Sequence, residues 1–313
     1  MIEPVEAVHS PLTVAVASGK GGTGKTLVAT NLSLVAHDVA TDDAYPHQAA
    51  RRVALVDCDP EGPNDHIFLG VSAPHVRPVM QVVAQVDSRT CDACGVCRDR
   101  CAYGAIRVLG SSALVFDELC HGCGVCMRVC PRSAITEVDQ RVGEVAFGSS
   151  DRACDLSIIT GRLDIGHVET PAVIRAARAA ASALHPDVVI VDAPPGVACA
   201  AVAAVRGVNA LLLVTEPTAF GIHDLELSIS LGRQLGLPMG VVVNREDGLD
   251  TTLDGLCTQW DVPIITRIPF SRRVAEVYAR GGLVIDEIPE MRPVFSQLWK
   301  ATIHLADQAV SPR

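Results

Sequence analysis

Residues 19–26 decide the fold, and they read Gly19-Lys20-Gly21-Gly22-Thr23-Gly24-Lys25-Thr26. An apolar, strand-like run at residues 12–18 precedes this stretch, and residues 25–39 continue it with helical periodicity. A G-x4-G-K-[ST] loop between a strand and a helix is typical of a phosphate site, because its backbone N–H groups turn toward phosphate oxygens. We therefore predict a nucleotide-binding loop in which Lys25 neutralises phosphate charge and Thr26 binds Mg²⁺.

The rest of the chain repeats this order of strand and helix. Further apolar runs lie at residues 52–57, 187–192, 210–215 and 239–244, and helical stretches lie at residues 171–184 and 222–235. Apolar runs without alternating polar residues are typical of parallel strands buried on both faces. The pattern predicts an α/β fold with a doubly wound, mostly parallel sheet.

Two runs of cysteine interrupt that order. Both read C-x2-C-x2-C-x3-C, the second lies 29 residues after the first, and their members are Cys91, Cys94, Cys97 and Cys101, then Cys120, Cys123, Cys126 and Cys130. This spacing is typical of iron–sulfur clusters, whereas zinc sites usually take two pairs of ligands. We expect residues 1–86 and 145–313 to form one P-loop ATPase domain. Residues 87–144 are expected to form a small inserted α+β domain with two [4Fe–4S] clusters.

Composition narrows the partners and the location. The formal net charge of −10 argues against binding to nucleic acid. The chain has no apolar run of 18 residues and its N-terminus lacks the pattern of a signal peptide, so neither a membrane span nor export is expected. The predicted helix at residues 289–310 has only Arg292 and Lys300 as basic residues, too few for a lipid-binding face. We expect a cytoplasmic protein, since that compartment keeps thiols reduced.

The phosphate loop resembles one known variant. With Lys20 the pattern is K-G-G-x-G-K-T, which resembles the deviant Walker A motif of the MinD/ParA/Mrp/nitrogenase iron protein superfamily. In that superfamily the first lysine reaches the nucleotide of the partner subunit. The resemblance therefore implies a homodimer, or a heterodimer with a related ATPase, that closes on ATP. It also implies catalytic roles for Lys20 and Lys25 at the transferred phosphate.

Two acidic strand ends resemble the same superfamily. Residues 56–60 (VDCDP) resemble its switch I, which implies that Asp59 orients the attacking water and that Asp57 supports Mg²⁺. Residues 189–196 (VIVDAPPG) resemble Walker B with switch II, which implies that Asp192 lies near Mg²⁺.

Two later loops resemble the part of the superfamily that holds the nucleotide base. Residues 243–245 (VNR) and 268–271 (IPFS) match in this way, so Asn244 and Pro269 are expected in the adenine pocket. Together with Gly19, Gly21, Gly22, Thr23 and Gly24 of the phosphate loop, they complete the expected ATP site.

The cysteine runs resemble those of two-cluster ferredoxins, in which the fourth cysteine of each run binds the other cluster. The resemblance implies one cluster on Cys91, Cys94, Cys97 and Cys130, and the other on Cys120, Cys123, Cys126 and Cys101. Pro131 follows the second run as in ferredoxins, whereas Ala102 replaces the proline expected after the first.

Four cysteines lie outside the two runs. Cys58, Cys154 and Cys257 are expected to be small buried residues. Cys199 lies seven residues after Asp192, where the nitrogenase iron protein has a cluster-binding cysteine. A subunit-bridging cluster and a buried structural thiol both stay open for Cys199, and the buried thiol is preferred.

These features favour an enzyme, a dimeric Mg-ATPase coupled to electron transfer through two [4Fe–4S] clusters. Its further partner is an unidentified redox protein or iron–sulfur acceptor. A first alternative is a Mrp-like carrier of iron–sulfur clusters, although Mrp-type proteins carry a C-terminal CxxC and the last third of this chain has only Cys257. A second alternative is a positioning ATPase like MinD or ParA, against which the acidic charge argues.

Overall fold

The computed structural model describes residues 10–38, 52–153, 155–246, 248 and 252–310. Its centre is a nine-stranded sheet in the order β11-β10-β9-β1-β8-β2-β7-β6-β3. The strands from β11 to β7 pair in parallel, with bounds β1 (Leu12–Ala17), β2 (Val53–Asp57), β7 (Leu156–Leu163), β8 (Val188–Asp192), β9 (Ala210–Thr215), β10 (Met239–Glu246) and β11 (Ile264–Pro269). The predicted α/β fold with a mostly parallel sheet is confirmed.

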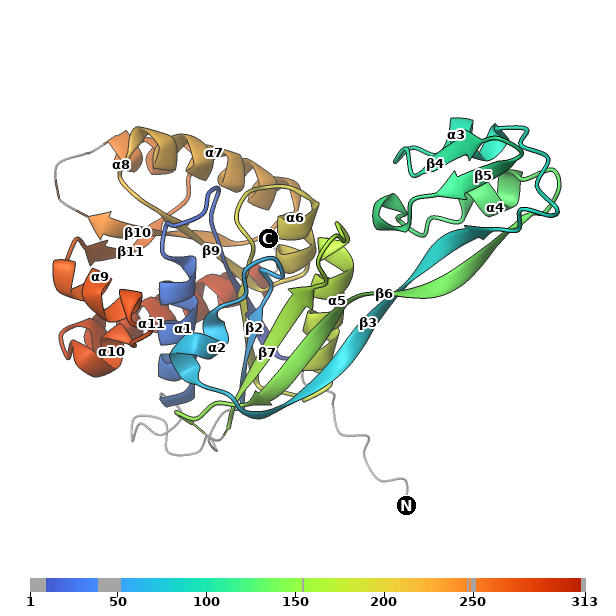
Figure 1. Cartoon of the computed structure of the whole chain (residues 1–313). Coiled ribbons are helices and arrows are strands. Elements are labelled where there is room, and N and C mark those ends of the chain that lie inside the picture. The colour runs from blue at the N-terminus through green and yellow to red at the C-terminus, as the bar shows by residue number, and fades with distance from the viewer. Residues whose placement is uncertain (1–9, 39–51, 154, 247, 249–251, 311–313) are drawn as a thin grey trace, which may run out of the picture.

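Helices cover both faces of this sheet (Figure 1). One face carries α1 (Lys25–Asp38), α2 (Asp65–Leu69), α9 (Arg272–Ala279), α10 (Val284–Glu287) and α11 (Met291–Val310). The other face carries α5 (Thr170–Ser182), α6 (Cys199–Val205), α7 (Ala219–Gln234) and α8 (Thr252–Gln259). The central parallel strands are therefore buried on both sides, which explains why they are apolar throughout.

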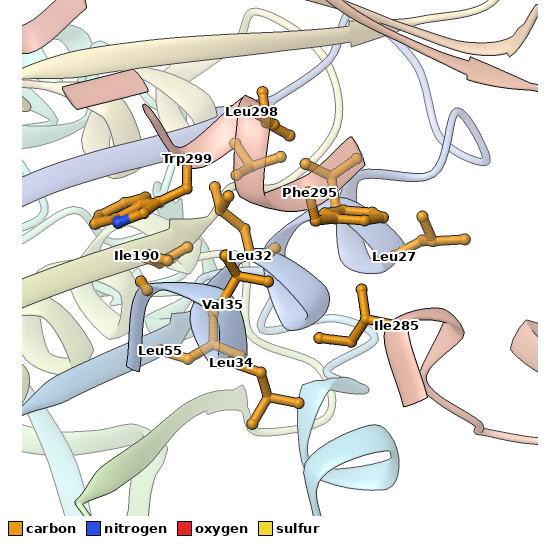
Figure 2. Packing of buried hydrophobic residues seen from close by; sticks show 14 of the residues in the cluster. Leu27, Leu32, Leu34, Val35, Leu55, Ile190, Ile285, Phe295, Leu298 and Trp299 are labelled. Atoms are coloured by element: carbon orange, nitrogen blue, oxygen red, sulfur yellow. The ribbon is translucent and has the colours of Figure 1, made fainter. Parts of the chain in front are cut away.

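Helix α11 packs into the first of these layers. Phe295, Leu298 and Trp299 are all fully buried, and Figure 2 shows them against Leu32 and Val35 of α1. Full burial of one such side chain contributes about 1.5–3 kcal/mol. The prediction that this helix packs on the sheet is confirmed. None of the helices that the structure describes is long and apolar enough to cross a membrane.

A long antiparallel ribbon extends one edge of the sheet. It consists of β3 (Ser72–Val86) and β6 (Ile135–Ser149), and β6 pairs antiparallel with β7. This ribbon was not predicted from the sequence, and Pro74 and Pro78 of β3 explain the omission. Proline cannot donate to a sheet ladder, and it is tolerated here because β3 is the edge strand.

The ribbon carries a small lobe at its far end, residues 87–134, which we call the cysteine lobe (Figure 1). It contains α3 (Val96–Arg100), β4 (Ile106–Leu109), β5 (Ser112–Val115), the short 3-10 helix η2 (Asp117–Leu119) and α4 (Val125–Val129). Its buried residues come from the lobe and from the ends of the ribbon, namely Ala84, Cys97, Ile106, Ala113 and Ile135. Strand β6 runs past residue 144, so the division into three parts stays a prediction.

Candidate functional site

The loop between β1 and α1 has the backbone shape of a phosphate site. Gly22 and Gly24 have φ angles of 81° and 99°, which L side chains rarely adopt. The Ser18 hydroxyl donates to the Lys20 carbonyl at 2.5 Å. The Asn244 amide donates to the carbonyl of Thr23 at 2.7 Å. These bonds brace the loop from both sides at the N-terminus of α1, where an anion is stabilised.

Thr26 and Asp192 lie together beside this loop. The Thr26 hydroxyl donates to Asp192 Oδ2 at 2.6 Å, and Asp192 Oδ1 is buried with no partner among the described residues. Burial, and then the charge of Asp57, raise the pKa of Asp192 to about 7. Hydroxyl and carboxylate oxygens are the ligands that Mg²⁺ prefers, so this pair fits the predicted cation site.

Asp57 shapes the segment that follows β2. Its carboxylate accepts hydrogen bonds from the backbone N–H groups of Asp59, Asn64 and Asp65, at 3.1, 2.8 and 3.1 Å. Burial raises its pKa to about 6, although these hydrogen bonds oppose the rise. Asp57 therefore holds the loop of residues 58–64 in place. Its support for Mg²⁺, which the resemblance implies, stays a prediction.

Asp65 belongs to the same cluster and was not predicted. It begins α2 and is fully buried, and neither carboxylate oxygen has a hydrogen-bond partner among the described residues. Burial, with the charges of Asp57 and Asp192, raises its pKa well above the ordinary value. The available signal was an acid eight residues after Asp57 in the same segment. Buried acids without partners are costly unless a cation joins them.

A cleft of about 470 Å³ opens over the phosphate loop. Eight predicted residues line it, namely Gly21, Gly22, Gly24, Lys25, Thr26, Asp59, Asn244 and Pro269. Five others do not line its wall, namely Gly19, Lys20, Thr23, Asp57 and Asp192. Of these, Thr23 accepts a hydrogen bond from Asn244, and Asp192 accepts one from Thr26. Thr23 and Asp192 therefore contact residues that line the cleft.

Apolar side chains also line the cleft, namely those of Pro269, Phe270 and Val274. Tyr278 lines it as well, with its phenol beside Thr26. Tyr278 was not predicted, because no motif surrounds it. Its ring stacks on Phe68 with centroids 4.8 Å apart, and burial raises the pKa of its phenol. A cleft that combines a glycine-rich phosphate loop with apolar side chains offers contacts to both the phosphates and the base of a nucleotide.

Lys20 does not line this cleft. Its Nζ lies 3.7 Å from Glu216 Oε2, and its side chain is 31% exposed. Glu216 also pairs with Arg245 at 2.6 Å. The position leaves Lys20 outside the site of its own chain, and its predicted role in a partner's site stays a prediction.

Four cysteines from the two runs surround one small pocket in the cysteine lobe. They are Cys91, Cys94, Cys97 and Cys130. This set contains the fourth cysteine of the second run, as in the crossed arrangement of two-cluster ferredoxins. Hydrogen bonds from the backbone, first from Ala113, lower the pKa of the Cys91 thiol. The pocket brings together the first predicted ligand set.

The second predicted ligand set is Cys120, Cys123, Cys126 and Cys101, and the contacts within the lobe concern part of it. Burial, and to a smaller extent the charges of Cys120 and Cys123, raise the pKa of the Cys126 thiol. Cys120 Sγ also accepts a hydrogen bond from the backbone of Ala84 at 3.5 Å. No contact in the described residues joins Cys101 to this group beyond the shared lobe core.

Among the residues described, no group of three or more His, Cys, Asp or Glu side chains is placed to hold one metal ion. Iron–sulfur binding by the cysteine runs stays a proposal.

The other cysteines give one correction. Cys58 and Cys257 are buried, as predicted, while Cys154 lies outside the described residues. Cys199 is exposed at the start of α6, so the expectation of a buried thiol was wrong. The chain turns outward after Pro195, which lines the nucleotide cleft, and carries Cys199 to the surface.

The strand, glycine loop and helix around this cleft define a P-loop nucleotide-binding protein. The chain belongs to the CobQ/CobB/MinD/ParA nucleotide binding domain family, whose model matches residues 14–284.

Two relatives come from Methanocaldococcus jannaschii. The uncharacterized protein MJ0579 is 27% identical over 272 residues, which are 86% of this chain and 90% of that protein. The uncharacterized protein MJ0578 is 24% identical over 289 residues, which are 92% of this chain and 95% of that protein. Both matches therefore span nearly the whole length of each chain.

Solved structures with the same fold include positioning ATPases. The septum site-determining protein MinD from Pyrococcus horikoshii, complexed with Mg-ADP, has a TM-score of 0.55 at 20% identity, covering 97% of this chain and 100% of that one. A ParA family ATPase from Chlorobium tepidum has a TM-score of 0.51 at 17% identity, with the same coverage. Likeness at this identity establishes the shared fold.

Proposed function

We propose that this protein is a dimeric Mg-ATPase whose nucleotide cycle controls electron transfer through two [4Fe–4S] clusters in the cysteine lobe. The observation that carries the proposal is the pocket lined by Cys91, Cys94, Cys97 and Cys130, on the same chain as a complete nucleotide cleft. Thiolates drawn from two separate runs around one pocket are the donor set that a cluster takes.

The nucleotide half of the proposal rests on the cleft and on the family. The MinD relative was solved with Mg-ADP, and the cleft offers the same chemistry through Lys25, Thr26 and Asp192. Asp59 lines the cleft, and in this proposal it orients the attacking water near the γ-phosphate. Bound Mg²⁺ supplies charge neutralisation at the β- and γ-phosphates.

The cluster half rests on the lobe. Backbone N–H groups donate to three of the sulfurs, from Ala93 to Cys91 at 3.5 Å, from Ala84 to Cys120 at 3.5 Å, and from Ala134 to Cys130 at 3.3 Å. Such bonds stabilise thiolates and tune the potential of clusters that thiolates hold. When bound, the clusters supply one-electron carriers, and the lobe holds them at the end of the ribbon.

Two other functions have some support. Cys94 and Cys123 are exposed, and this access suits a carrier that passes clusters to an acceptor protein. The solved neighbours favour a positioning ATPase, although the charge of −10 and the packed face of α11 argue against a DNA or lipid surface.

The deciding experiment uses full-length protein reconstituted anaerobically with iron and sulfide. We expect about eight irons per chain, ATP hydrolysis, and a cluster reduction potential that differs between Mg-ADP and a non-hydrolysable Mg-ATP analogue. Cys97→Ser should lower the iron to about four per chain, whereas the exposed Cys199→Ser should leave it unchanged. Equal potentials with the two nucleotides would reject the redox function, and rapid transfer to an apo-ferredoxin would favour the carrier.

A further inference from the structure

The cysteine lobe contacts the nucleotide-binding part of the chain at a second place besides the ribbon. We call this part, the described residues outside 72–149, the body. His121 lies directly after Cys120, and its Nδ1 is 3.0 Å from Oε1 of Glu169 in the body. Glu169 is only 5% exposed, whereas the side chain of His121 is 37% exposed, so the contact joins a buried carboxylate to an imidazole at the surface. The two atoms are at ion-pair distance but are not aligned as a regular hydrogen bond. A contact of this kind can tighten or open with a small movement.

On the lobe side, the loop that carries His121 is held firmly. Gly122 has a φ angle of 59°, and a Cβ there would collide with the carbonyl of Val82 in β3. The Gln81 amide donates to the Cys120 carbonyl at 2.9 Å. The ring of Tyr103, two residues after Cys101, stacks on His121 with centroids 3.7 Å apart. A displacement of His121 should therefore also displace Tyr103, near the first cysteine run, and Cys120 of the second run.

On the body side, Glu169 lies one residue from a contact with the predicted switch I. Glu169 is the N-cap residue of α5. The next residue is Thr170, whose hydroxyl donates a hydrogen bond to Glu61 Oε1 at 3.4 Å. The Leu163 N–H also donates to the Pro60 carbonyl at 3.0 Å. Residues 60 and 61 directly follow Asp59, which lines the nucleotide cleft.

A movement of residues 59–61 should displace helix α5, because the helix is closely packed on the sheet. Val173 of α5 packs on Gly161 of β7, where an added Cβ would lie 3.0 Å from the valine and 3.6 Å from the Asp57 carbonyl. Close packing of this kind passes a displacement on, because the core has no free volume to take it up.

We propose that the His121–Glu169 contact transmits the nucleotide state from switch I to the second cysteine run. The path runs from Asp59 and Glu61 through Thr170 and Glu169 to His121. It rests on the proposed function, since it assumes that the cleft holds a nucleotide whose γ-phosphate moves switch I. His121 and Glu169 are positioning residues that act through the loop and not on a reacting group.

The repeat in the lobe supplies a matched control. Asp92 follows Cys91 as His121 follows Cys120, so the two residues occupy the same place in the two runs. Asp92 lies 3.8 Å from Arg132, which belongs to the lobe itself. Asp92→Asn therefore changes a charge at the equivalent position without touching the body.

The test measures hydrogen exchange in residues 117–124 of reconstituted full-length protein, with Mg-ADP and then with a non-hydrolysable Mg-ATP analogue. We expect the exchange rates of the wild type to differ at least about threefold between the two nucleotides. Glu169→Gln keeps the volume and removes the charge, and it should reduce this ratio to near one. His121→Gln should do the same from the other side, whereas Asp92→Asn should keep the wild-type ratio.

Each outcome decides one question. If Glu169→Gln keeps the wild-type ratio, or if Asp92→Asn loses it equally, the proposed path is wrong while the redox function stands. If the wild type itself shows no difference, the path is also wrong, and the reduction potential measured with the two nucleotides then judges the redox function by itself. Iron content and nucleotide affinity of each variant show whether both sites are intact.

Discussion

Replacing Lys20 by glutamine should stop hydrolysis and leave the fold almost unchanged. The Lys20–Glu216 pair is 3.7 Å long and partly exposed, and such pairs contribute about 0.2–1 kcal/mol. Glu216 keeps its second partner, Arg245, in the variant. At the phosphate of a partner subunit, however, a second cation is worth about 10³-fold in rate, or about 4 kcal/mol. The loss in kcat should therefore greatly exceed the loss in stability.

Mixing two inactive variants tests whether Lys20 acts across the dimer. Asp59→Asn removes the residue that orients water within the same site. In a mixed dimer with Lys20→Gln, the site on the Lys20→Gln chain keeps its own Asp59 and receives Lys20 from the partner. The other site lacks both. Since half of the dimers in an equal mixture are mixed, about one quarter of the wild-type activity should return.

The assay is steady-state release of phosphate after the subunits have exchanged. Lys300→Gln is the control, because Lys300 is exposed on α11 and away from the cleft. Full activity of Lys20→Gln alone would show that the lysine has no catalytic role. A mixture that stays inactive, although sedimentation shows mixed dimers, would refute action in trans.

Three further predictions concern the fold and the nucleotide cleft. Phe295→Ala should lower the free energy of unfolding by about 3–5 kcal/mol, because the ring is fully buried; a loss under about 1 kcal/mol in urea unfolding would contradict this packing. Asn244→Ala removes the hydrogen bond to the Thr23 carbonyl and should weaken ADP binding about tenfold, as measured by calorimetry. An unchanged affinity for ADP would contradict this role of Asn244. Asp65→Asn should shift the Mg²⁺ concentration needed for ADP to stabilise the protein upward by about tenfold, whereas an unchanged midpoint would exclude Asp65 from the cation site.

The sequence predicted the parts of the cleft that backbone chemistry dictates. The glycines, Lys25 and Thr26 follow from what a strand–loop–helix must do to hold phosphate, and the structure lines the cleft with most of them. Asp65 and Tyr278 were missed because their places in the site come from tertiary packing, to which the sequence near them gives at most a weak pointer. Asp65 is placed by the hydrogen bond from its N–H to Asp57, and Tyr278 is placed by stacking on Phe68.

The cysteine runs show the same limit on a larger scale. Their spacing predicted the ligands, and one predicted set, including Cys130 from the other run, lines a common pocket. The ribbon that carries the lobe was not predicted, because β3 contains Pro74 and Pro78, which are unusual within a strand. This ribbon and the contact of His121 with Glu169 both join the lobe to the rest of the chain, and neither has a local sequence pattern.

The internal repeat explains why that contact is informative. Two runs with the same spacing give two cysteine loops of similar backbone shape, with left-handed glycines at Gly95 and Gly124 before α3 and α4. A contact needed only for folding of the lobe would serve both loops equally. Instead, Asp92 pairs within the lobe, whereas His121 pairs with a buried glutamate of the body. The two loops therefore differ where the lobe meets the nucleotide-binding domain, which favours a role for His121 in communication over a role in holding iron.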